Sequence, residues 1–351
     1  MERNSSETHD DSLTGKNFRK IMLVIFSAMI ILAAISIVPM MTSGAEREAI
    51  IRIPAKATEK NLNDTLSKYF GDSYAEKVVK LMKLRHIDLS SRHGAYLIPE
   101  GTSPFRAMRK LGRGAQSPIK LTINGFRGLP LMADRMSRKI DSSSQTLLRQ
   151  FTDPSALSSY NLTPEQALAL FLDDTYEVYW TTTPQELMKK IGDHYNSVWN
   201  TERRKKAEAL GLTPEEVITI ASIVDEETNK KDEKGRVGRL YINRLHKGMR
   251  LQADPTVRFA LQDFTIKRVK GEHLNVDSPY NTYRVTGLPP GPIRTTSVET
   301  IDLILNSTPS EDLYMCARED FSGYHNFATN YGDHVQNALR YQHALDMKGI
   351  N

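Results

Sequence analysis

Three acids stand side by side at Asp225, Glu226 and Glu227, directly after the apolar run IASIV. A carboxylic acid held in apolar surroundings keeps its proton to a higher pH than usual, which suits a general acid near neutral pH. Two interpretations are open at this point: one of the acids is a catalyst, or all three form the solvated end of a helix. The choice depends on where each side chain points.

A helix is predicted to carry these acids. Thr213 followed by Pro214, with Glu216 three residues after the threonine, is typical of a helix that starts with a capping box. An α-helix turns by about 100° per residue, and with Val217 at zero the apolar side chains cover the arc from about −120° to about +40°. Glu226 falls at about 180°, on the opposite and polar face, so we expect it to be solvated.

Glu227 and Asp225 are placed differently on this helix. Glu227 falls at about −80°, between Ile220 and Ile223, and Asp225 falls at about +80°, near the other edge of the apolar arc. A carboxylate among aliphatic side chains is costly unless it is paired or protonated. Glu227 is therefore a candidate for the catalytic acid. The alternative is a helix that has frayed by this residue, which would leave the acid in solvent.

An apolar segment near the N-terminus is predicted to be a transmembrane helix. Residues 21–41, IMLVIFSAMIILAAISIVPMM, carry no charge and are long enough to cross the ~30 Å hydrocarbon core. Lys16, Arg19 and Lys20 precede it, so the positive-inside rule keeps residues 1–20 in the cytoplasm and the rest of the chain outside. A cleaved signal peptide is the alternative, although its apolar core would exceed the usual ~7 to 15 residues.

The composition is that of a globular protein of about two domains. The 351 residues are 39% hydrophobic and 25% charged, with a net charge of +5 that favours anionic partners. Nucleic acid is not expected among these anionic partners, because the domain after the apolar segment is predicted to lie outside the cell membrane. The single cysteine, Cys316, cannot form an intramolecular disulfide, and no CxxC or Cys/His cluster offers a zinc site. His325, His334 and His343 are too loosely spaced to predict a metal site.

The chain after the apolar segment predicts an α+β organisation. Residues 48–125 read as a small mixed unit: a strand, two helices, a second strand, a helix, and a closing strand at 120–125. Helical segments at 126–160 form a connector, and the larger domain covers 161–351. Its first helix is predicted to start at a capping box after residue 163. The strand-helix-helix-strand order of the first unit recurs in compact glycan-binding modules.

Four separated motifs give the larger domain a family resemblance. They are ASIVDEET (221–228), YINRL with KGMRLQADPTVRFAL (241–261), SPYNTYRVTGLPPGPI (278–293) and LYMCAREDFSGYHNF (313–327). In this order, and with the N-terminal apolar segment, they resemble the endolytic murein transglycosylases of the YceG-like (MltG) family over most of residues 50–345. The family's acidic segment usually reads like IVEKE. Asp225 therefore replaces its first glutamate, and Glu227 matches its second.

The resemblance implies a fold and an activity. The fold is α+β: an N-terminal transmembrane helix, a small LysM-like α/β module at 48–125 and a mixed α+β YceG-like catalytic domain. The activity is that of a lytic transglycosylase, which cleaves the MurNAc-GlcNAc β-1,4 bond of peptidoglycan without water and leaves a 1,6-anhydro ring. One acid is enough for this route, whereas a hydrolase normally needs a second carboxylate. The reaction needs no metal and no cofactor.

The resemblance also suggests roles for particular residues. The helical wheel and the position in the family motif both favour Glu227 as the catalytic acid. Asp225 and Glu226 point away from Glu227 on the wheel. Asp254 remains an alternative as a second carboxylate. Tyrosine faces and amide groups hold sugar rings and hydroxyls, and the rigid LPPGP turn supports them. The expected substrate-binding residues are Asn243, Gln252, Asp254, Thr256, Tyr280, Asn281, Tyr283 and His325.

A location and partners follow from the same resemblance. The protein is expected to be a single-pass protein of the bacterial inner membrane, with its N-terminus in the cytoplasm and its catalytic domain outside. Its partners would be new peptidoglycan glycan strands, whose elongation it would terminate, and the peptidoglycan synthases of the elongation or division machinery. Two alternatives stay open: a wall-binding or division scaffold without activity, favoured by the replacement at Asp225, and a muramidase that hydrolyses the same bond.

Overall fold

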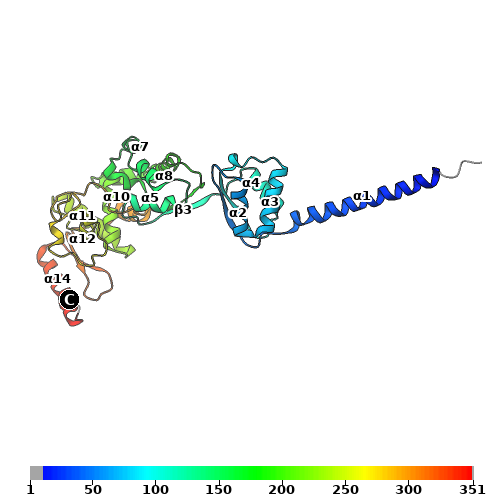
Figure 1. Ribbon diagram of the computed structural model, residues 1–351. Helices are drawn as coiled ribbons and strands as arrows, with labels where there is room; N and C mark the ends of the chain where they lie inside the picture. The colour runs from blue at the N-terminus through cyan, green and yellow to red at the C-terminus, as the bar shows by residue number, and fades with distance from the viewer. Residues whose placement is uncertain (1–10, 350–351) are drawn as a thin grey trace, which may run out of the picture. The chain divides into compact units, whose positions relative to one another are not determined.

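The computed structural model describes residues 11–349 and divides them between two compact units (Figure 1). The first unit holds the chain up to Pro118 together with Tyr179–Thr181. The second holds Ile119–Val178 and the chain from Thr182 onwards. Both units mix helices with short two-stranded antiparallel sheets, so the expected α+β class is confirmed.

Helix α1 (Asp11–Thr42) contains the predicted apolar segment and is the long blue helix of Figure 1. Its stretch Phe18–Thr42 is long and apolar enough to cross a membrane, and none of the most apolar window is buried within the protein. Exposed apolar surface of this extent is stable in lipid rather than in water. Length and composition fit a membrane anchor and a signal sequence alike.

The rest of the first unit has the predicted strand-helix-helix-strand order. Its elements are β1 (Ala49–Ile53), α2 (Glu59–Phe70), α3 (Asp72–Leu84), η1 (Leu89–Arg92), β2 (Gly94–Ile98) and α4 (Pro104–Gly112). Strand β1 alternates buried and exposed residues and pairs with β2 in antiparallel register, with Ile51 opposite Tyr96. These two side chains lie at the centre of a core that the two helices cover with Leu66 and Val78.

The strand predicted to close the first unit belongs elsewhere. Strand β3 (Ile119–Ile123) pairs with β4 (Asp174–Val178), with Leu121 opposite Tyr176. The prediction that it closes the module at 48–125 was wrong, because an alternating strand reveals its buried face but not its partner strand. The helical segments predicted as a connector at 126–160 also lie in the second unit, where α5 (Leu129–Ser137) packs on α6 (Ser144–Phe151).

The second unit is built mainly from helices. Its remaining elements are α7 (Pro154–Ser158), η2 (Pro164–Leu170), α8 (Pro184–Val198), α9 (Thr201–Ala209), α10 (Pro214–Glu227), α11 (Lys231–His246), α12 (Asp254–Leu261), η3 (His273–Asn275), α13 (Val298–Leu305), β5 (Tyr314–Ala317), β6 (His325–Ala328) and α14 (Tyr331–Met347). Both predicted capping boxes are present. That of Thr163 and Gln166 opens the 3₁₀ helix η2, and that of Thr213 and Glu216 opens α10.

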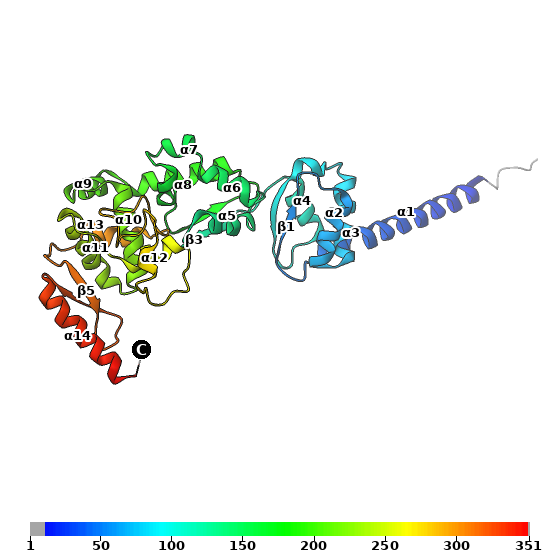
Figure 2. The same ribbon diagram turned by 60° about the vertical axis from the view of Figure 1, so that its left-hand side comes forward.

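Helix α10, which ends at Glu227, is the central helix of this unit. Figure 2 shows it among α9, α11 and α13, which all pack against it. Every residue from Val217 to Val224 is buried, including Thr219 and Ser222 of the face predicted to be polar. The hydroxyl of Ser222 donates to the carbonyl of Thr219 at 2.7 Å and accepts from the Ile293 amide at 3.0 Å. All faces of a helix can thus be buried when its small polar side chains form hydrogen bonds with other groups of the protein.

Two glycines bring α11 close to α13. A Cβ on Gly235 would lie 2.7 Å from the carbonyl oxygen of Leu303, and one on Gly238 would lie 2.6 Å from Cγ1 of Ile304. Both distances are shorter than real Cβ contacts, so only glycine fits at these positions. They lie three residues apart on one face, which lets α13 approach the backbone of α11. Helices α11 and α13 also both pack against α10.

Candidate active site

A cleft of about 250 Å³ opens where α10 ends. The end of α10, one face of α11, the turn before α12 and the hairpin β5–β6 all contribute to it. Its lining residues are Glu227, Leu240, Tyr241, Arg244, Leu251, Gln252, Asp254, Tyr283, Met315, Cys316, Ala317 and His325. Five residues predicted from the sequence therefore lie around one cleft: Glu227, Gln252, Asp254, Tyr283 and His325.

Glu227 is the last residue of α10 and lies half-buried at this cleft. The hydroxyl of Tyr241 donates to its Oε1 at 2.9 Å. Burial raises the pKa of Glu227 to about 7, and the negative charge of Asp254 also raises it. The bond from Tyr241 acts in the opposite direction, as do the electrostatic interactions with His325 and Arg258. A carboxyl with such a pKa both gives and takes a proton near neutral pH.

Asp254 and Tyr283 form a second polar pair in the cleft. The Tyr283 hydroxyl donates to Oδ1 of Asp254 at 2.6 Å, and burial together with this carboxylate raises the pKa of Tyr283. Asp254 is the first residue of α12, where the positive end of the helix dipole favours a carboxylate. The phenol therefore stays protonated and holds Asp254 in place.

Arg244 brings a buried positive charge to the cleft. Its Nε donates to the Leu313 carbonyl at 2.6 Å, and its Nη1 donates to the Leu251 carbonyl at 2.8 Å. The guanidinium also lies over the ring of Tyr314, 5.3 Å from the centroid. It thus ties α11 to the turn before α12 and to the start of the hairpin. Gln252 at that turn has a positive φ of 53° and is exposed, so its amide is accessible from solvent.

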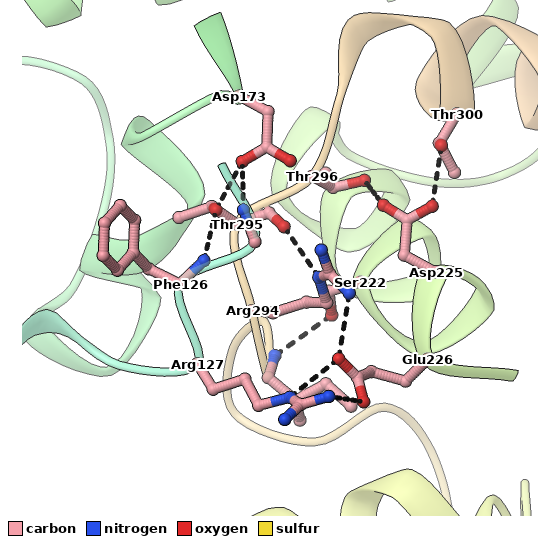
Figure 3. A network of polar contacts seen from close by, with 12 residues as sticks. Phe126, Arg127, Asp173, Ser222, Asp225, Glu226, Arg294, Thr295, Thr296 and Thr300 are labelled. Carbon is pink, nitrogen blue, oxygen red and sulfur yellow. Dashed lines mark hydrogen bonds and ion pairs between the residues drawn. The ribbon is translucent and has the colours of Figure 1, made fainter. Parts of the chain in front are cut away.

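The two other acids of the opening motif, Asp225 and Glu226, bond to residues outside the cleft lining (Figure 3). Glu226 forms a bidentate ion pair with Arg127, at 2.8 and 2.9 Å. It also forms an ion pair with Arg294, through a single contact at 3.0 Å. Its side chain is only 8% exposed, so the prediction that Glu226 is solvated was wrong. The helical wheel located the face of Glu226 correctly, but it does not show that loops with two arginines cover that face.

Asp225 is buried on another side of α10. Its carboxylate accepts from Thr296 at 2.5 Å and from Thr300 at 2.8 Å (Figure 3). It also accepts from Lys234 at 2.6 Å. These donors lie on α11, on the loop before α13 and on α13 itself. Asp225 and Glu226 therefore connect the end of α10 to neighbouring segments, and each carboxylate forms an ion pair with a basic side chain.

Four predicted substrate-binding residues lie outside the cleft lining. Asn243 donates to the carbonyls of Ser310 and Asp312, while Thr256 is fully buried and bonds to the Ala253 carbonyl.

Asn281 is fully buried as well. Its amide donates to the Leu274 and Val276 carbonyls, and its Oδ1 accepts from the Tyr283 amide. Tyr280 packs its ring against Phe259, with centroids 4.7 Å apart. Polar motif residues thus serve two purposes: some line the cleft, and others satisfy the backbone of the loops that shape it.

His325 is held by a carboxylate from α11. Its Nδ1 lies 3.0 Å from Oε2 of Glu233, and its backbone N–H donates to Oε1 of Glu233 at 2.7 Å. The ring of His325 is thus fixed at the edge of the cleft. Among residues 11–349, no group of three or more His, Cys, Asp or Glu side chains is placed to hold a metal ion.

Sequence reasoning missed three residues of the site: Tyr241, Arg244 and Glu233. Tyr241 and Arg244 stand three apart on α11, so both lie on the face of that helix that turns to the cleft. This spacing within YINRL was a usable signal. Glu233 had no comparable signal, because its partner His325 is 92 residues away along the chain.

Comparison with known proteins identifies this mixed α+β fold. The chain belongs to the YceG-like family, whose model matches residues 51–340, and the resemblance seen in the motifs is confirmed. The fold is similar to the crystal structure of a yceG-like protein from Listeria monocytogenes, with a TM-score of 0.57 and 23% identity. That match covers 83% of this chain and 98% of the Listeria chain.

Two curated relatives are similar in sequence. An endolytic murein transglycosylase of Streptococcus pneumoniae is 28% identical over 179 residues, which are 48% of this chain and 31% of that protein. An endolytic murein transglycosylase of Bacillus subtilis is 33% identical over 133 residues, which are 38% of this chain and 36% of that protein. The matched segments thus span well under half of either relative.

Proposed function

We propose that this protein is an endolytic peptidoglycan lytic transglycosylase with Glu227 as its acid and base. The observation that carries the proposal is the state of Glu227: a half-buried carboxyl in a cleft, with a pKa that burial raises to about 7. The names of the two curated relatives support the reaction and its substrate. The replacement at Asp225 does not argue against activity, because Asp225 is bonded away from the cleft.

One carboxyl accounts for the whole reaction. Protonated Glu227 gives its proton to the glycosidic oxygen O4, which links MurNAc C1 to GlcNAc C4, and the C1–O4 bond breaks. The resulting carboxylate then takes the proton of the MurNAc C6 hydroxyl, while O6 bonds to C1 and closes the 1,6-anhydro ring. Glu227 is protonated again at the end, and no water is consumed. A pKa near the working pH serves both steps.

The neighbours of Glu227 are given supporting roles in this proposal. Tyr241 orients the carboxyl through its hydrogen bond, and its bond strengthens as the carboxylate forms. Arg258 adds a positive charge that favours the same anion, and Arg244 brings a second positive charge to the cleft lining. Gln252, Tyr283 and His325 are proposed to contact the sugar, since hydroxyl and acetamido groups need both donors and acceptors.

The first unit and α1 are proposed to restrict where the enzyme acts. In this proposal α1 anchors the chain in the inner membrane with its N-terminus in the cytoplasm, and the βααβ unit is a LysM-like module that binds glycan. An enzyme held there meets strands as they leave the membrane, so its cuts would terminate their elongation. Peptidoglycan synthases are the expected neighbours.

A hydrolytic muramidase is the second candidate, and Asp254 is the observation that favours it. This carboxylate lines the same cleft and interacts electrostatically with Glu227. A second carboxylate is what a hydrolase uses to activate water or to form a covalent intermediate. Against this role, the Tyr283 hydroxyl already occupies one oxygen of Asp254.

The product of the full-length protein in detergent on purified glycan strands tests the proposal. Mass spectrometry is expected to find 1,6-anhydroMurNAc ends, whereas hydrolysis would give ends heavier by one water. The Glu227→Gln variant is expected to lose activity by about 10²-fold to 10⁴-fold. Glu215→Gln, the same change on the same helix outside the cleft, serves as the control. Unchanged activity in Glu227→Gln would refute the assignment, and hydrated ends that vanish in Asp254→Asn would favour the muramidase.

A further inference from the structure

Glu233 of α11 is a buried carboxylate with three hydrogen-bond donors around it. Two come from His325, its backbone N–H at 2.7 Å and its Nδ1 at 3.0 Å, and the third is the Thr228 hydroxyl at 3.3 Å. Only 7% of Glu233 is exposed. A carboxylate in such surroundings is stable because its lone pairs are met by donors.

These contacts determine which nitrogen of His325 carries the proton. An ionised carboxylate can only accept hydrogen bonds, so the bond to Glu233 requires a hydrogen on Nδ1. In the neutral ring the lone pair is then on Nε2. The ring lines the same cleft as Glu227, and its Nδ1 is occupied. Nε2 is therefore the ring nitrogen left for a ligand, and it acts as an acceptor.

The same carboxylate connects His325 to the catalytic end of α10. Thr228, whose hydroxyl donates to Glu233, directly follows Glu227 in the chain and is buried. Glu233 thus fixes the end of α10 and strand β6 with one side chain. Its neighbour Asp232 also contacts the hairpin, through the Tyr324 hydroxyl at 3.2 Å, but it is exposed and does not touch His325.

We propose that Glu233 is a positioning residue that holds His325 in its Nδ1–H form, so that Nε2 accepts a hydrogen bond from the glycan. The donor would be a sugar hydroxyl or an acetamido N–H, the two donor types that a MurNAc-GlcNAc strand offers. This role rests on the proposed function for its ligand. The tautomer itself depends only on the contacts within the protein.

The tautomer is tested by NMR on the full-length chain in detergent with ¹⁵N-labelled histidine, at a pH where an ordinary imidazole is neutral. His325→Ala identifies the signals. The wild type is expected to carry its proton on Nδ1. In Glu233→Gln the amide oxygen still accepts the backbone N–H, so the amide NH₂ faces Nδ1 and the proton is expected to move to Nε2. An Nε2–H form in the wild type, or no change in Glu233→Gln, would overturn the proposal.

Kinetics on soluble glycan strands test the effect on the ligand. In Glu233→Gln, Nε2 becomes a donor, so KM is expected to rise about tenfold with kcat changed less than threefold. Glu233→Asp keeps the charge and is expected to recover part of this loss, while Asp232→Asn stays within about twofold of the wild type. The double variant His325→Ala/Glu233→Gln is expected to be no worse than His325→Ala.

Two kinetic outcomes contradict the proposal. Equal increases in KM for Asp232→Asn and Glu233→Gln would show that hairpin docking alone matters, and additive losses in the double variant would show that Glu233 does not act through His325. A wild type that makes no anhydro ends would refute the proposed function instead. The NMR experiment would then still decide the positioning role.

Discussion

The Tyr241 hydroxyl donates to Oε1 of Glu227 at 2.9 Å and joins the last residue of α10 to the cleft face of α11. Burial keeps the pKa of Tyr241 well above its usual value, so the phenol remains a donor over the working range of pH. Its bond favours the carboxylate form of Glu227, whereas burial favours the acid form. These two opposing effects are the largest contributions to the pKa of about 7.

Removing this donor is expected to shift the pH profile. In Tyr241→Phe the pKa of Glu227 rises above about 7, because the bond that lowers it is gone. The proton-donating form then persists to higher pH, and the alkaline fall of kcat/KM moves up by roughly one pH unit. Rates measured between pH 5 and 9 on soluble glycan check this shift. Tyr195→Phe, at another buried tyrosine, should leave the profile unchanged.

Glu227 is also expected to make stability depend on pH. Its folded-state pKa of about 7 lies above the ordinary value of 4.5, so the folded protein binds the extra proton between these two values. Stability therefore falls as the pH rises from about 4.5 through about 7. Glu227→Gln removes this loss. We expect the variant to be about 1 to 2 kcal/mol more stable than the wild type at pH 8, after allowance for partial exposure, and nearly equal to it at pH 4.5.

Urea unfolding at both pH values measures this difference. The signal is tryptophan fluorescence from Trp180 and Trp199, of which Trp199 is buried in the unit that contains α10. Other groups that titrate contribute equally to both proteins and cancel in the comparison. A wild type more stable than Glu227→Gln at pH 8 would contradict the raised pKa.

The ion pairs of Glu226 are expected to stabilise the fold. In Glu226→Gln, the guanidinium groups of Arg127 and Arg294 lose their shared counter-charge, and we expect the free energy of unfolding to fall by about 2 to 3 kcal/mol. Asp134→Asn breaks the exposed pair with Arg138 and serves as the control, with a change of about 0.5 kcal/mol or less. Urea unfolding measures both. Equal effects in the two variants would show that the Glu226 cluster is no stronger than a surface pair.

Restoring the usual family residue at Asp225 is expected to cost stability without raising activity. The short carboxylate fits three donors between 2.5 and 2.8 Å, so the extra methylene of Asp225→Glu must displace them. We expect a loss of about 1 to 3 kcal/mol in the free energy of unfolding. Anhydro-end formation below the unfolding transition should stay within about threefold of the wild type. A large gain in activity would mean that the first acid of the motif takes part in the reaction.

Local signals predicted much of the fold. Capping boxes at Thr163 and Thr213 located two helix starts, and the alternation in β1 and β3 located two strands. These signals are local because they depend on residues at most a few positions apart. The partner of β3 could not be predicted in this way. Strand β4 lies about 50 residues further on, and the residue pattern of a strand does not specify which strand pairs with it.

The site shows the same limit. The helical wheel separated Glu227 from Glu226, yet it left Glu226 in solvent, because the covering residues Arg127 and Arg294 come from loops far away in the chain. Among the predicted substrate-binding residues, Asn243, Thr256 and Asn281 have the polar groups expected in a sugar site. In the structure they bond to nearby loop backbone instead.

The sequence by itself determined the apolar helix, the α+β class, the family and the acid that ends α10, because each depends on residue type and short spacing. Only the tertiary structure decided which acid faces the cleft and which acids are neutralised by cations. It also brought Tyr241 and the Glu233–His325 pair to Glu227. The physical reason is that desolvation and hydrogen bonding act through space, so a carboxyl acquires its pKa and its partners only when distant segments pack around it.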